Sequence, residues 1–200
     1  MRKSYKSFSI DDNFLNKGTL IEEILQYMET APPASCVYLL ITNNCGGAVN
    51  DAERLVRGIC KNDHIKIHLI FRGYAISAAA YVYSYFVFYD AKHQHVVIEA
   101  GTPLCVVFHK PRIIRNQALS FANNIFENTQ PIDVYNKYLL AISKEFDEIF
   151  NAMHGILLAE GELIAPHLKD VYNMNGDVSF TFPKEVHSEK AGRYRHYRKS

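Results

Sequence analysis

A serine, a histidine and an aspartate at separate places in this chain have the side chains that nucleophilic hydrolysis needs. Ser77 lies among small residues just after an apolar segment, His109 follows the apolar run at 104–108, and Asp177 follows a glycine. A serine hydroxyl attacks only when a base takes its proton, and a third group must hold that base in the right tautomer. We therefore expect Ser77 to attack, His109 to carry the proton and Asp177 to orient the imidazole.

Two adjacent glycines supply the second part of such a site. Gly46 and Gly47 join an apolar segment to a predicted helix, and glycines let backbone N–H groups turn toward a ligand. We expect the N–H groups of Gly47 and Ala78 to stabilise an oxyanion, with Gly46 and Cys45 in contact with the substrate. Cys45 has no neighbouring base or cation in the sequence, so it is a weaker rival to Ser77 as the nucleophile.

Each of these residues also has an ordinary structural interpretation. Ser77 by itself is typical of a helix N-cap, and His109 by itself is typical of a strand-end histidine satisfied by the backbone. Asp177 in Asn-Gly-Asp is an ordinary turn acid, and Asp170 is its rival as the third member. The combination of these residues with the glycine turn favours the catalytic interpretation.

The hydrophobic pattern of the first half predicts helices and strands in alternation. Apolar residues recur at helical spacing over 20–28 and 52–59, and short apolar runs at 37–41 and 65–71 suit buried strands. The helix that contains Ser77 follows the second of these strands. This order of elements implies parallel pairing and an α/β fold.

The second half is expected to contain short strands and one long helix. Strands are predicted at 86–89, 96–98 and 104–108, separated by turn-like polar segments. A broad apolar stripe from 135 to 153 predicts a helix that packs on the sheet or on another subunit.

Three motifs together resemble a known family. The Gly46-Gly47 turn, the Gly-x-Ala-x-Ser-Ala segment that ends at Ala78, and His109-Lys110-Pro111 are similar to those of the Clp protease proteolytic subunit, a member of the ClpP/crotonase superfamily. The resemblance runs over about residues 7–192. It implies a ClpP/crotonase-like ββα superhelix of stacked βαβ units, one domain over 1–192, and a serine endopeptidase that works through an acyl-enzyme.

The resemblance also implies partners. A peptide or unfolded protein would be the substrate, extended beside the glycine turn, and the chain would form a homo-oligomeric ring. An unfoldase ATPase is a further implied partner, although the N-terminus lacks the apolar or glycine-rich hairpin that lines the family's pore. No cofactor is implied.

Two other functions stay open beside the peptidase. A catalytically silent scaffold or assembly subunit is motivated by Asn43-Asn44-Cys45, where the family has Asn-Ser-Pro, and by longer intervals between Ser77, His109 and Asp177. A crotonase-type acyl-CoA enzyme shares the fold and the oxyanion hole, but it has no need of the serine–histidine pair. A role in phage capsid maturation, as in peptidases of related fold, also stays open.

Composition excludes several classes of partner. The 200 residues include 22 basic and 21 acidic side chains, a net charge of +1, which gives no reason to expect nucleic acid or an anionic membrane as main partner. No segment is apolar enough for a membrane span. The basic residues at 193–200 predict a flexible tail.

The cysteines and histidines suggest neither disulfides nor a metal. The four cysteines show no C-x-x-C spacing, which predicts reduced thiols and a cytoplasmic protein. His64 and His68 form one pair, and Asp90, His93 and His95 crowd one turn, but neither set has an organised further ligand.

Overall fold

The computed structural model of the chain forms two compact units. The structure describes residues 4–11, 14, 18–115, 118–125, 134–159, 161 and 165–182. One unit comprises Met1–Val107 with Ser179–Ser200, and the other comprises Phe108–Val178. The single domain expected over 1–192 stays a prediction, and the expected tail at 193–200 lies outside the described residues.

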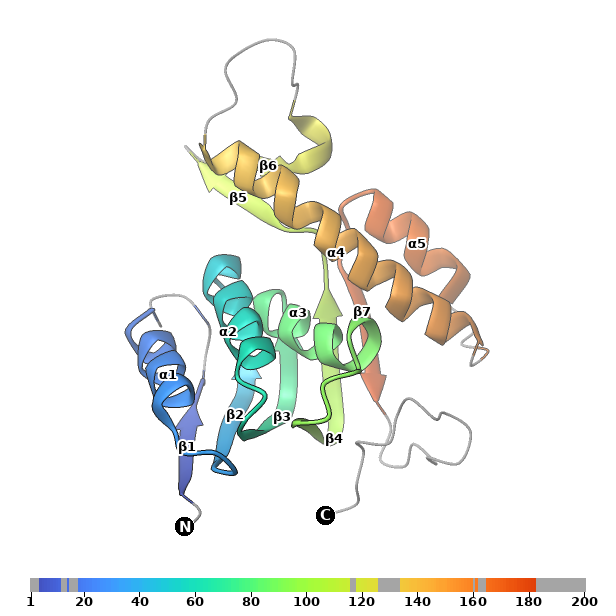
Figure 1. Ribbon diagram of the computed structural model, residues 1–200. Helices are drawn as coiled ribbons and strands as arrows, with labels where there is room; N and C mark the ends of the chain where they lie inside the picture. Colours follow the sequence, from blue (N-terminus) through green and yellow to red (C-terminus); the bar gives the residue numbers. More distant parts are fainter. Residues whose placement is uncertain are drawn as a thin grey trace. The chain divides into compact units, whose positions relative to one another are not determined.

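The first unit is built on a five-stranded sheet with the order β1-β2-β3-β4-β7 (Figure 1). The strands are β1 (Tyr5–Ser9), β2 (Cys36–Asn44), β3 (Lys66–Ile76), β4 (Val96–Phe108) and β7 (Val178–Phe182). The pairs β1 with β2, β2 with β3, and β3 with β4 are all parallel. The predicted α/β class with parallel pairing is therefore confirmed.

Three helices connect the parallel strands and lie on one face of the sheet in Figure 1. They are α1 (Gly18–Thr30), α2 (Val49–Lys61) and α3 (Ala78–Ser84). The stripe predicted for the second helix is fully buried at Ala52, Leu55, Val56 and Ile59. Alternate residues of β2 and β3 are also fully buried, as the period of two requires when helices cover one face: Val37, Leu39, Ile41, Ile67, Leu69 and Phe71.

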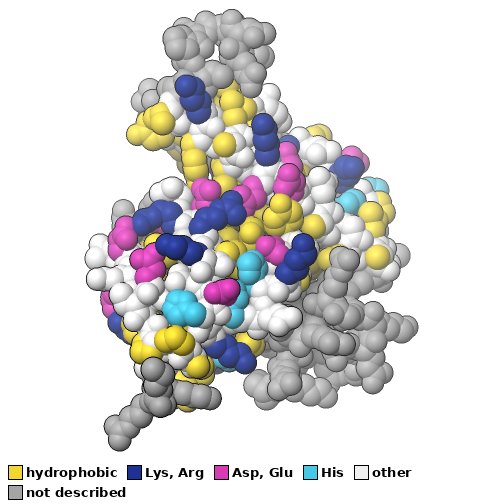
Figure 2. Space-filling model, in the orientation of Figure 1, with side chains coloured by type: hydrophobic (Ala, Val, Ile, Leu, Met, Phe, Trp, Pro, Cys, Tyr) yellow, Lys and Arg dark blue, Asp and Glu magenta, His cyan; other side chains and the backbone are white. Residues whose placement is uncertain are grey.

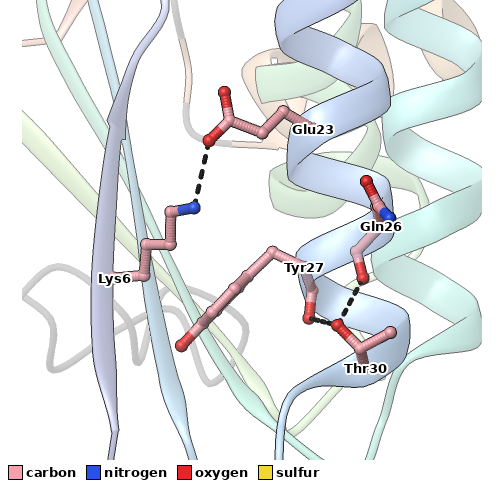
Figure 3. A network of polar contacts seen from close by, with 5 residues as sticks. All are labelled: Lys6, Glu23, Gln26, Tyr27 and Thr30. Atoms are coloured by element: carbon pink, nitrogen blue, oxygen red, sulfur yellow. Dashed lines mark hydrogen bonds and ion pairs between the residues drawn. The ribbon is translucent and has the colours of Figure 1, made fainter.

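A polar network joins the edge strand β1 to α1 (Figure 3). Lys6 Nζ lies 3.0 Å from Glu23 Oε1 and 5.0 Å from the centre of the Tyr27 ring. Near the end of the helix, Thr30 Oγ1 donates to the Gln26 carbonyl at 2.8 Å. Contacts this exposed contribute about 0–1 kcal/mol each, so the apolar core positions α1 and these contacts only adjust it.

Charged side chains of both signs intermingle over α1 and α2 in Figure 2. Arg54 of α2 pairs with Glu22 of α1 and with Asp51, and Lys61 lies 3.1 Å from Glu29. This face is a solvated, mixed-charge surface, which agrees with the balanced composition.

The strand predicted at 86–89 is wrong. These residues belong to a π-helical turn, η1 (Tyr85–Tyr89), that continues α3, and Phe86, Val87 and Phe88 are buried. Aromatic and β-branched residues favour strands only where they meet a pleated surface, and packing overrode that preference. The runs at 96–98 and 104–108 form one strand, β4, with a register shift opposite Phe71 and Gly73.

The second unit contains a hairpin and two helices. The hairpin pairs β5 (Arg112–Arg115) with β6 (Ala118–Phe121) in antiparallel register, and it was not predicted. The helices are α4 (Val134–Ala159) and α5 (Ala165–Asn173). The predicted long helix is confirmed, with Leu139, Ile142, Phe146, Ile149 and Met153 buried, but Tyr135 is 58% exposed, so the buried stripe begins one turn later.

Candidate functional site

Ser77 occupies a strained turn between β3 and α3. Its backbone has φ 58° and ψ −116°, and its side chain makes no capping hydrogen bond to the helix. A non-glycine residue in such a conformation costs about 1–3 kcal/mol and persists only where neighbours hold it, most often at functional sites. Here Ser77 N donates to the Val107 carbonyl at 2.9 Å, and Ser77 O accepts from Tyr81 N at 2.8 Å. The turn presents a half-buried serine between a strand and a helix.

Gly46 packs directly against this turn. A Cβ added at Gly46 would lie 2.5 Å from Ser77 Cβ and 2.9 Å from Ala78 N, and it would also collide with the Ile76 carbonyl oxygen. Gly46 has φ +90°, a conformation that side chains rarely adopt. Only glycine fits here, and its backbone lies against the serine turn.

The two predicted oxyanion donors belong to these adjoining turns. Gly47 is exposed with φ 120°, and Ala78 is the first residue of α3. Neither backbone N–H group has a hydrogen-bond acceptor among the described residues. The structure therefore brings Gly46, Ser77 and Ala78 together, and within the described part of the chain both donors are uncommitted.

Cys45 lies beside Gly46 and is exposed. Its Sγ is 3.8 Å from the Tyr74 hydroxyl, a contact that does not activate a thiol. All four cysteines are free in the structure. The expected contact between Cys45 and a substrate stays a prediction.

His109 is buried, and a backbone acceptor holds its ring. His109 Nδ1 lies 2.7 Å from the Lys110 carbonyl oxygen. A carbonyl only accepts, so Nδ1 carries the proton and Nε2 of the neutral ring carries the lone pair, which has no hydrogen-bond donor among the described residues. Burial lowers the pKa of His109 below its ordinary value, Arg112 lowers it further, and the Lys110 hydrogen bond and the charge of Asp177 oppose this. The imidazole is thus a neutral base at physiological pH.

The side chain of Lys110 contacts residues of two helices. Its Nζ lies 3.7 Å from Asp147 Oδ1 of α4 and 5.1 Å above the ring of Tyr172 of α5. The Tyr172 hydroxyl donates to the same carboxylate at 2.9 Å. These contacts restrain Lys110, whose carbonyl accepts the hydrogen bond from His109 Nδ1. No feature of the sequence predicted them.

Asp177 is exposed just before β7. In the part of the chain that the structure describes it makes no hydrogen bond to His109, and the Lys110 carbonyl occupies the position expected for a carboxylate. Asp177 acts on His109 through its charge, which raises the imidazole pKa. The rival Asp170 is exposed on α5. The orienting role of Asp177 stays a prediction.

The predicted site residues divide between the two units. Gly46, Gly47, Ser77 and Ala78 belong to the first unit, whereas His109 and Asp177 belong to the second. The meeting of Ser77 with His109 stays a prediction.

Comparison with known proteins adds no family. Neither a protein-family model nor a curated protein matches this sequence.

Two other clusters of ionisable groups are simple pairs. His68 Nδ1 lies 3.0 Å from Glu99 Oε1, and His93 Nε2 lies 3.1 Å from Asp90 Oδ2. Within the described ranges, no three such side chains are placed to hold a metal ion. Over those same ranges, no helix has both the length and the apolar content to cross a membrane.

Proposed function

We propose that this chain is a ClpP-like serine endopeptidase with a ClpP/crotonase-like fold. The observation that carries the proposal is the Ser77 turn, with φ 58° and the Gly46 backbone packed against it. A serine on a strained turn between strand and helix, beside backbone N–H groups that have no acceptor among the described residues, is typical of enzymes that transfer acyl groups through a serine.

In the proposed reaction, Ser77 Oγ attacks the carbonyl carbon of a peptide bond and gives its proton to His109 Nε2. The N–H groups of Gly47 and Ala78 donate to the oxyanion that forms. The amine then leaves with the proton from His109, and water hydrolyses the acyl-enzyme by the same route. Loss of one oxyanion donor typically costs about 3 kcal/mol of transition-state stabilisation.

His109 and Asp177 have separate parts in this proposal. The Lys110 carbonyl keeps the proton on Nδ1, which leaves Nε2 to accept the proton of Ser77. The charge of Asp177 raises the pKa of His109 and so favours the imidazolium that forms in the reaction. In this proposal the triad consists of Ser77, the buried His109, and Asp177, which acts on His109 through its charge.

The substrate of this proposal is a peptide or unfolded protein in extended form beside the glycine turn, where its backbone would pair as an added strand. The chain would act as a cytoplasmic homo-oligomeric ring, with an unfoldase ATPase as a further partner. Light scattering over the micromolar range tests the assembly, and a strictly monomeric protein would contradict that part.

Covalent labelling tests the chemistry. The intact mass is measured after incubation with a fluorophosphonate for the wild-type protein, Ser77→Ala, His109→Ala and the control Ser7→Ala, whose serine is exposed on β1. We expect one adduct in the wild-type and Ser7→Ala proteins and none in the other two. No adduct at any assembly state would overturn the proposal in favour of a catalytically silent scaffold, and hydrolysis of labelled casein then tests the peptidase activity itself.

A further inference from the structure

Asn44, the last residue of β2, has no exposed surface. A buried amide must satisfy both its donor and its acceptor, since each unpaired group carries a desolvation penalty. Both ends are satisfied here: Nδ2 donates to the Ile10 carbonyl at 2.9 Å, and Oδ1 accepts from Gly46 N at 2.9 Å. The side chain therefore ties the glycine turn to the chain that follows β1.

The same segment holds the other side of Gly46. Phe14 N donates to the Gly46 carbonyl oxygen, and both Ile10 and Phe14 are fully buried. Ile10 N in turn donates to the Leu40 carbonyl at 2.7 Å, which anchors the segment to β2. The peptide group before Gly46 is thus held by the Asn44 side chain, which is itself bonded to Ile10, and the peptide group after Gly46 is held by Phe14.

Peptide planarity carries this restraint to the oxyanion donor. The Gly46 carbonyl and the Gly47 N–H belong to one planar peptide group and point in opposite directions when it is trans. With the carbonyl bonded to Phe14 N, the direction of the Gly47 N–H is set. The bond from Gly46 N to Asn44 sets the preceding peptide in the same way.

A turn with two adjacent glycines needs such a restraint. Glycine loses more conformational freedom on ordering than any other residue, and residue 45 is a cysteine where a proline would have stiffened the turn. We infer that Asn44 is a positioning residue for the oxyanion hole, which holds the Gly46-Gly47 turn so that the Gly47 N–H meets the developing charge. The inference rests on the proposed function.

Steady-state kinetics on a fluorogenic peptide that the wild-type protein cleaves test this role. We expect Asn44→Ala to lower kcat roughly 10- to 100-fold with KM within about twofold, somewhat less than the effect of deleting an oxyanion donor. The inhibition constant of a matching peptide aldehyde, whose hemiacetal oxygen occupies the oxyanion hole, should rise by the same factor. A residue that only supports the fold would not move these two quantities together.

Asn62→Ala is the matched control. Asn62 is also a buried asparagine with its amide bonded to a backbone carbonyl, Gly58 O at 2.8 Å, but it caps the C-terminal end of α2, whereas the glycine turn precedes the N-terminal end of that helix. We expect kcat and the aldehyde inhibition constant of this variant to stay at their wild-type values.

Asn44→Ser decides the question if the alanine variant does not fold. Its hydroxyl keeps an acceptor for Gly46 N, as serine does more weakly than asparagine in such turns, and it loses the donor to Ile10 without burying a charge, so kcat should fall less than about tenfold. The inference is overturned if a folded Asn44 variant changes kcat without changing the aldehyde constant, or if kcat is unaffected. Absence of a fluorophosphonate adduct on the wild-type protein would refute the proposed function as well, whereas an adduct with unaltered Asn44-variant kinetics would refute this inference alone.

Discussion

The backbone of the Ser77 turn and the imidazole ring of His109 are held in place in different ways. At the Ser77 turn, backbone lies against backbone, and the conformations at Gly46 and Ser77 are ones that few residues tolerate. At His109 the backbone imposes no such demand, and the ring is set by burial and by one hydrogen bond to the Lys110 carbonyl.

This difference determines how each region should respond to substitution. A backbone arrangement held by close contact has no alternative geometry, so a single added carbon disrupts it. A buried base held by one acceptor keeps its geometry while nearby charges shift its pKa. Substitutions at the Ser77 turn should therefore abolish activity, whereas substitutions around His109 should change the reaction rate by small factors.

The largest effect is expected for Gly46→Ala. The added Cβ meets Ser77 Cβ at 2.5 Å, and the φ of +90° strains any side chain. Strain alone should lower the free energy of unfolding by about 1–3 kcal/mol. We expect urea unfolding to show this loss and adduct formation with a fluorophosphonate to disappear.

Gly155→Ala is the control for that variant. Gly155 lies in α4 with nothing within 4 Å of an added Cβ, so alanine should raise the free energy of unfolding by about 0.5–1 kcal/mol. If Gly46→Ala reacts as fast as the wild-type protein, the close packing described for the Ser77 turn has no bearing on catalysis.

The next effect concerns Asp177→Asn. Where an aspartate alone holds the histidine tautomer, its amide variant loses about 10⁴-fold in kcat. Because the Lys110 carbonyl holds the tautomer here, we expect a loss below about tenfold, measured by labelling rate and peptide hydrolysis. Asp170→Asn serves as the comparison and should stay at the wild-type rate, and a 10⁴-fold loss for Asp177→Asn would show that the carboxylate itself orients the ring.

The pH dependence should reveal the lowered pKa of His109. The base form is needed for attack, so a lowered pKa keeps it populated at more acidic pH. We expect the acid limb of the labelling rate to have its midpoint below the ordinary imidazole value of about 6.5. Asp177→Asn should move that midpoint further down and Arg112→Gln should move it up, whereas a wild-type midpoint at or above the ordinary value would contradict buried His109 as the base.

The same pKa shift affects stability with a definite sign. Between the lowered pKa of the folded state and the ordinary pKa of the unfolded state, His109 binds a proton in the unfolded chain but not in the folded chain. The free energy of unfolding should therefore fall as the pH drops from about 6.5 toward the lowered folded pKa.

The smallest effect is expected for Tyr172→Phe. The change removes the hydroxyl that donates to Asp147 but keeps the ring, which stacks on Phe150 at 3.9 Å. We expect a loss of about 0.5–1.5 kcal/mol in urea unfolding, with the labelling rate within a few-fold of wild type. A large fall in labelling would show that the contacts of Lys110 position His109 more tightly than its own hydrogen bond does.

Local pattern was sufficient for most of the first unit. The apolar stripe at Ala52, Leu55, Val56 and Ile59 predicted a buried helical face, and the α/β order predicted parallel pairing. Both signals depend only on the periods of helix and strand. The same reasoning failed at Phe86–Phe88, where strand-forming residues lie in a buried π-helical turn, and at the β5–β6 hairpin, which carried no strong period.

The sequence by itself determined that Gly46-Gly47 and Ser77 each lie in a turn that follows a strand and precedes a helix, because glycines and small residues mark turns wherever they fall between apolar runs. Only the tertiary structure decided what holds them. Asn44 bonds to Ile10, 34 residues away, and His109 bonds to a neighbouring carbonyl instead of to Asp177. Such choices depend on which polar groups are buried together, and burial is a property of the whole packed chain that no local spacing encodes.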